Sequence, residues 1–163
     1  MNLCRDPETS GSLKTDCTQC VWNLESLEAT RSLGQHLAGH LPTGSILLLE
    51  GQLGAGKTSL VQGLALACGI TERITSPTFA LAQHYPDGNP PLVHLDLYRL
   101  DAPGSADELF LQEEEEAREI GALMAVEWPE RLKLELPEAW RLKLCHAGEG
   151  RRAQLDAPRK AST

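Results

Sequence analysis

The sequence lacks several features that would place a 163-residue chain in common protein classes. It has no run of about 18 apolar residues, the length of a membrane-spanning helix, so we expect neither a transmembrane segment nor a membrane partner. Residues 1–25 lack the apolar core of a secretory signal, which favours a cytoplasmic protein. The chain has only 15 Lys+Arg against 23 Asp+Glu, and a net charge of -8 argues against non-specific nucleic-acid binding.

Cysteines are few and odd in number. The sequence contains five: Cys4, Cys17, Cys20, Cys68 and Cys145. Without a secretory signal, an odd count argues against a disulfide framework and for a reducing compartment. Cys17 and Cys20 have the spacing of metal ligands, but no second pair follows, so we prefer a polar tail to a zinc site.

The length suits one domain, which we place at residues 22–156 between polar tails at 1–21 and 157–163. Apolar spacing predicts a helix over Leu24–Leu41 with Ser26 as its N-cap, and the apolar run Ile46–Leu49 predicts a strand buried on both faces. A helix is also predicted at Lys57–Cys68, ended by Gly69. The further elements are strands at Phe79–His84, Leu92–Leu97 and Leu123–Glu127, a helix at Ala106–Ile120, and a hairpin of Trp140–Cys145 with Arg152–Leu155. The pattern indicates an α/β sandwich, with a mostly parallel central sheet and antiparallel edge strands.

The run Gly51–Thr58, GQLGAGKT, matches the phosphate-binding pattern G-x-x-x-x-G-K-[ST] completely. A strand is predicted directly before it and a helix directly after it, as the pattern requires. Its glycines let successive backbone N–H groups point at one centre, where the helix also places its positive end. Lys57 would bridge the β- and γ-phosphates and Thr58 would bind Mg²⁺. We therefore predict a nucleoside triphosphate site on a P-loop NTPase-like fold.

Two acids stand at the ends of apolar runs. Asp96 follows one run and Glu127 another, and ligands of open α/β sheets bind at the carboxyl ends of the strands. Either acid could complete a magnesium shell, or could simply be a solvated carboxylate. Between them and the P-loop lies Thr75–Phe79, where a threonine can sense the γ-phosphate in switch-type NTPases. An ordinary turn is the alternative for that segment.

Four blocks together resemble the TsaE (YjeE) family of small P-loop ATPases over roughly residues 24–155. They are Gly51–Thr58, Ser76–Phe79, His94–Leu100 and Glu127–Glu130. The resemblance implies a Mg-dependent ATPase subunit required for N6-threonylcarbamoyladenosine formation at position 37 of tRNA. It would support turnover of the TsaD–TsaB transferase, would meet tRNA through that complex, and would be a slow ATPase alone. ATP and Mg²⁺ are the implied ligands, and the absence of a guanine-reading N-K-x-D motif favours ATP over GTP.

The resemblance also implies roles for single residues. The implied catalytic residues are Lys57, Thr78, Asp96 and Glu127, and the implied magnesium ligands are Thr58, Asp96 and Glu127. The implied nucleotide contacts are Gly51, Gly54, Ala55, Gly56, Lys57, Thr58, Ser59 and Trp128.

Other interpretations stay open. A small-molecule P-loop kinase usually has an arginine-rich lid, yet residues 73–131 contain few arginines and the acidic run Glu113–Glu116 occupies the expected lid stretch. A non-hydrolysing, ATP-dependent scaffold is not excluded by sequence. The acidic run fits a solvated helix face, or alternatively a docking surface for a basic partner. His94 is expected to be a packed or edge histidine.

Overall fold

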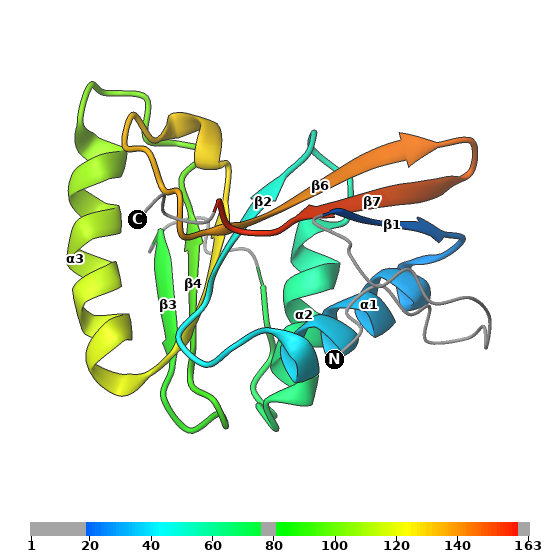
Figure 1. Ribbon diagram of the computed structural model, residues 1–163, viewed down its shortest axis with the longest axis horizontal. Helices are drawn as coiled ribbons and strands as arrows, with labels where there is room; N and C mark the ends of the chain where they lie inside the picture. Colours follow the sequence, from blue (N-terminus) through cyan, green and yellow to red (C-terminus); the bar gives the residue numbers. More distant parts are fainter. Residues whose placement is uncertain (1–18, 76–80, 160–163) are drawn as a thin grey trace.

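The computed structural model describes residues 19–75 and 81–159, which form a 7-stranded sheet in the order β1-β7-β6-β2-β5-β4-β3 (Figure 1). The middle strands β6, β2, β5 and β4 are parallel, whereas β1, β7 and β3 pair antiparallel to their neighbours. The predicted fold class is therefore confirmed. The strands are β1 (Gln19–Leu24), β2 (Ile46–Glu50), β3 (Ala82–Tyr85), β4 (Leu92–Asp96), β5 (Leu123–Glu127), β6 (Trp140–Ala147) and β7 (Gly150–Asp156).

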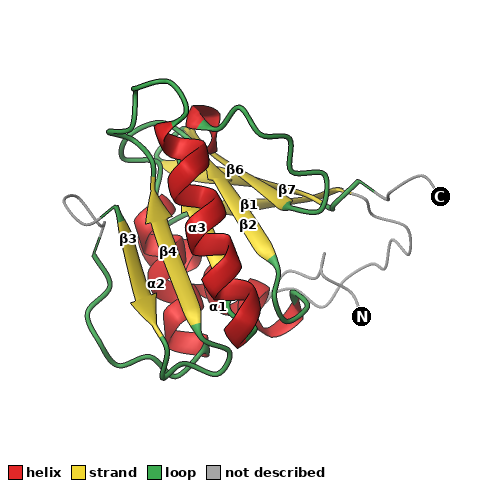
Figure 2. Cartoon of the chain, turned by 90° about the vertical axis from the view of Figure 1, so that its left-hand side faces the viewer, coloured by secondary structure: helices red, strands yellow, loops and turns green. Residues whose placement is uncertain are grey.

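Helices cover both faces of this sheet. Helix α3 (Ser105–Ile120) lies on one face, and α1 (Leu27–His40) and α2 (Lys57–Ala67) lie on the other, as Figure 2 shows with α3 in front. A short 3-10 helix, η1 (Pro129–Arg131), follows β5. No helix among the described residues is both long enough and apolar enough to cross a membrane.

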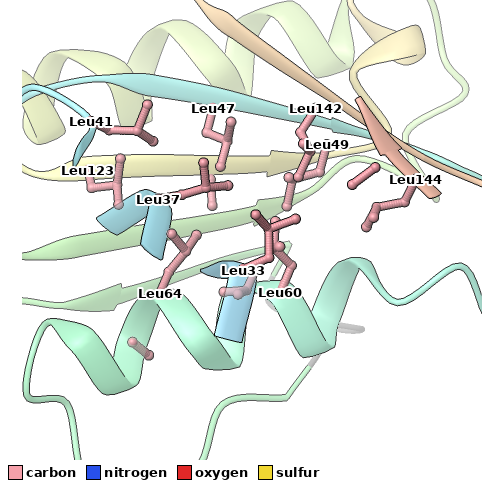
Figure 3. Packing of buried hydrophobic residues seen from close by; sticks show 14 of the residues in the cluster. Leu33, Leu37, Leu41, Leu47, Leu49, Leu60, Leu64, Leu123, Leu142 and Leu144 are labelled. Atoms are coloured by element: carbon pink, nitrogen blue, oxygen red, sulfur yellow. The ribbon is translucent and has the colours of Figure 1, made fainter. Parts of the chain in front are cut away.

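The buried middle of strand β2, Leu47–Leu49, is apolar on both faces of the sheet. Leu47 and Leu49 belong to the core on the α1/α2 side (Figure 3), while Leu48 belongs to the core under α3. All three side chains are buried. Alternate side chains of a strand point to opposite faces, so a strand covered on both sides needs apolar residues at every position.

The N-terminal part differs from the sequence prediction. Leu24 ends strand β1 instead of starting a helix, and residues 19–21, which were assigned to a tail, pair with β7. Helix α1 begins after Ser26, as predicted, where the Ser26 hydroxyl accepts a hydrogen bond from the Ala29 N–H. Cys20 is disulfide-bonded, a single bond that the argument against a disulfide framework did not predict, and the bond argues against Cys20 as a zinc ligand.

Helices α1 and α2 approach closely at two glycines. A Cβ atom on Gly34 of α1 would collide with the backbone carbonyl of Leu60, and one on Gly63 of α2 would collide with that of Arg31. The Arg31 Nε also donates to the Gln62 Oε1 at 3.1 Å, which joins the helices at their edge. Glycine at both positions lets the backbones pack directly against each other, and this contact fixes α2 and the loop before it.

We expect Gly63→Ala to lower the free energy of unfolding by about 1–3 kcal/mol, because the added methyl group meets rigid backbone. The matched control is Gly39→Ala in the exposed part of α1, where a Cβ atom meets nothing within 4 Å. That control should gain about 0.5–1 kcal/mol from the higher helix propensity of alanine. Urea unfolding of both variants measures the difference, and equal stabilities would contradict the proposed close contact.

Candidate nucleotide-binding site

The loop from Gly51 to Thr58 connects β2 to α2 and has the backbone of a phosphate cradle. Gly51, Gly54 and Gly56 all have positive φ, at 156°, 78° and 103°. At Gly51 a Cβ atom would also lie 2.7 Å from the carbonyl oxygen of Leu144, so glycine is required there. Helix α2 begins without a side-chain cap, which leaves its first N–H groups available to an anion.

Lys57 lies inside this loop and is only 5% exposed. Its ammonium group donates to the carbonyl oxygen of Gly51 and, at 3.4 Å, to that of Gln52. It also lies 4.1 Å from the centroid of the Trp128 ring, a cation–π contact. Burial lowers the pKa of Lys57, and the nearby Glu127, Glu130 and Asp96 partly oppose that shift. The structure thus holds a cation where a phosphate would arrive.

The two predicted acids end neighbouring strands. Asp96 of β4 is paired in register with Glu127 of β5. The Thr58 hydroxyl lies 3.5 Å from the Glu127 Oε1, while one Asp96 oxygen accepts a hydrogen bond from the Tyr98 N–H at 3.0 Å. Hydroxyl and carboxylate oxygens are hard donors of the kind Mg²⁺ accepts, and Mg²⁺ usually takes few protein ligands beside phosphates and water. The donors around Thr58 therefore fit that ion.

The chain matches one family over most of its length. The sequence model of the family "Threonylcarbamoyl adenosine biosynthesis protein TsaE" covers residues 24–154. The chain belongs to the TsaE family. A Synechocystis protein named "tRNA threonylcarbamoyladenosine biosynthesis protein TsaE" is 50% identical to this chain, over 67% of this chain and 69% of that protein. A Nostoc protein of the same name is 45% identical, over 79% of this chain and 80% of that protein. The crystal structure of Bacillus YdiB aligns with a TM-score of 0.68 and 30% identity, over 91% of this chain and 89% of that one.

Trp128 forms one wall of the site in this TsaE-family chain. It has a left-handed backbone, with φ of 58°, which costs a residue other than glycine about 1 kcal/mol or more. Its ring stacks at a tilt against Tyr98, with centroids 4.7 Å apart, and the Arg131 guanidinium lies 5.9 Å from the Tyr98 ring. The strained turn after β5 thus directs the indole over Lys57.

Two polar residues lie at the site for which the sequence predicted no role there. Arg151, at the start of β7, donates to the carbonyl oxygen of Gly54 at 3.1 Å. His94 is indeed packed inside β4, as expected, but its Nε2 also lies 2.6 Å from the Glu127 Oε2. Strand alternation alone could have suggested His94, because it lies two residues before Asp96 and so shares its face of the sheet. No local signal points to Arg151, which the strand order brings to the loop.

The remaining predicted residues lie as follows. Ala55 is buried beneath the loop, and Ser59 is half-buried in the first turn of α2. Thr78 and the block Ser76–Phe79 lie outside the described residues.

The acidic run lies on α3, on the sheet face away from α2, so it does not cover the P-loop. Glu115 and Glu116 are exposed, as a solvated face predicts, but Glu113 is 7% exposed and pairs with His84 of β3. Glu116 approaches the other nitrogen of His84 at 3.7 Å. His84, Glu113 and Glu116 form a group that could hold a metal ion, and it is separate from the loop site.

Lys57→Ala should weaken ATP binding by roughly 10- to 150-fold, because a hydrogen bond to a charged group contributes about 1.5–3 kcal/mol. The matched control is Lys143→Ala, which removes an exposed lysine from β6 and should leave the affinity unchanged. Titration calorimetry with ATP measures both variants. An unchanged affinity in Lys57→Ala would contradict the placement of the phosphates in this loop.

Proposed function

We propose that the chain is a Mg-dependent ATPase that serves tRNA N6-threonylcarbamoyladenosine formation at position 37 in the cytoplasm. In this proposal it supports repeated turnover of a TsaD–TsaB transferase and meets tRNA through that complex. One observation carries the ATPase part: Thr58 of the P-loop and Glu127 of β5 face each other at 3.5 Å beside the buried Lys57. Membership of the TsaE family and the names of its relatives support the pathway.

The backbone N–H groups of the loop would bind the ATP phosphates at the start of α2. Lys57 would exchange its contacts with the carbonyls of Gly51 and Gln52 for the β- and γ-phosphates. Thr58 and Glu127 would hold Mg²⁺, with Asp96 beside them. The ion supplies positive charge that offsets the charge developing on the transferred phosphoryl group. Thr78 is the proposed switch residue.

The outcome for the acidic run bears on the kinase alternative. Small-molecule P-loop kinases usually carry an arginine-rich lid over the transferred phosphate, and the acidic run occupies the stretch where that lid is expected. The stretch instead forms α3 on the far face of the sheet. Because that stretch does not lie over the P-loop, we propose water, and not a second substrate, as the phosphoryl acceptor.

Thr58→Ala and Glu127→Ala should each lower Mg-dependent phosphate release by at least about tenfold, because each removes a ligand of the ion that stabilises the transition state. ATP affinity measured without Mg²⁺ should change much less. Thr43→Ala and Glu138→Ala remove an exposed threonine and an exposed glutamate, and serve as matched controls. If both site variants released phosphate at the wild-type rate, the magnesium shell would be wrongly assigned.

Addition of TsaB, TsaD and tRNA should raise the ATPase rate at least about tenfold, because a charge supplied in trans can contribute several powers of ten in P-loop enzymes. The measurement is phosphate release by the chain alone and in the full mixture, with Lys57→Ala in the mixture as the blank. A chain that hydrolyses ATP as fast alone as in the complex would contradict partner stimulation. A chain that binds ATP but never hydrolyses it would be a scaffold instead.

A further inference from the structure

His94 is a polar residue in an apolar place. It lies in the middle of β4 with no exposed surface, and its Nδ1 has no hydrogen-bond partner. Burial of an unsatisfied ring nitrogen is unfavourable, and an apolar side chain of similar size would avoid that cost. The polar contact that the structure gives this ring is the one from Nε2 to the Glu127 Oε2, at 2.6 Å. The histidine is therefore explained by what it does to Glu127.

The sheet register makes room for this contact. In the parallel pair of β4 and β5, His94 is opposite Ala125 and Asp96 is opposite Glu127. Residues two apart share a face of the sheet, so all four side chains point to the α1/α2 side. Ala125 carries only a methyl group, which leaves space for the imidazole to lie diagonally toward Glu127.

The contact leaves one carboxylate oxygen for the P-loop. Glu127 is 3% exposed; its Oε2 faces His94 and its Oε1 lies 3.5 Å from the Thr58 hydroxyl. A hydrogen bond at Oε2 prevents the carboxylate from rotating, so Oε1 stays directed at Thr58. The hydrogen bond to Oε2 requires that Nε2 carries a proton and donates it. The missing partner at Nδ1 agrees with the tautomer in which Nδ1 is bare.

We propose that His94 is a positioning residue for magnesium: it fixes Glu127 so that Oε1, together with the Thr58 hydroxyl, is ready to bind the ion beside the phosphates. This inference rests on the proposed function. Hydrogen-bond partners of metal ligands commonly orient those ligands, and their removal costs 10- to 100-fold in metal affinity in general. A purely structural histidine would instead tolerate an apolar substitute without any change in magnesium binding.

Two substitutions separate these roles. His94→Leu fills the space without a donor, and His94→Gln keeps an amide N–H near the position of Nε2. Calorimetric titration of Mg²⁺ into the full chain saturated with ADP should show affinity about 10- to 100-fold weaker for the Leu variant, and within about threefold of wild type for the Gln variant. ADP affinity without Mg²⁺ should be unchanged in both, because Lys57 and the loop are intact. In a Glu127→Gln background, His94→Leu should have little further effect on Mg²⁺ affinity.

A folded His94→Leu variant that binds Mg²⁺ like wild type would overturn the inference and leave the proposed function standing. Wild-type protein that fails to bind Mg²⁺ with ADP would overturn both. A second measurement needs no variant: nitrogen NMR of ¹⁵N-histidine-labelled wild-type protein reports which ring nitrogen carries the proton. A protonated Nε2 and a bare Nδ1 are expected for His94, and the reverse arrangement would overturn the inference.

Discussion

The parallel pairing of β2 with β5, and of β5 with β4, sets the distance between the P-loop and the acids. The three strands end at one edge of the sheet, although their residues are far apart in the sequence. Lys57 and Thr58 follow the end of β2, while Asp96 and Glu127 end β4 and β5. A slip of one residue in either pair would turn one acid to the other face of the sheet. The site therefore depends on backbone register before it depends on any single side chain.

Register in turn depends on packing over both faces. The leucines of β2 alternate between two cores, and each buried leucine contributes about 1.5–3 kcal/mol of transfer free energy. The glycine contact between α1 and α2 adds a constraint of another kind, because it fixes the spacing of the helix that presents Lys57. Core packing therefore also positions the phosphate loop, because α2 packs in the core and directly follows that loop.

Local sequence signals predicted much of this arrangement. The P-loop, helix α2, strand β5 and the acids at the strand ends were all read correctly, because each is encoded by a short contiguous pattern. Strand β1 was missed because Leu24 fits the helical spacing of the next segment as well as the alternation of a strand. Arg151 and the contact of His94 with Glu127 depend on pairing between distant strands, which no local pattern specifies. Glu113 was expected on a solvated helix face but is buried, and its pairing with His84 joins two elements that the pattern of the acidic run does not connect.

The strand order also has a consequence for folding. Strand β1 joins the sheet only through β7, the described strand farthest from it in the sequence, and the Gln19 side chain donates to the Asp156 carboxylate at 2.8 Å. During synthesis on the ribosome, β1 emerges first yet has no partner until β7 has emerged. Its alternating buried residues must stay unpaired for the whole of that interval, and contacts so distant in sequence form slowly. One edge of the sheet is therefore completed by strands from opposite ends of the described chain, and loss of β7 would leave β1 without its partner.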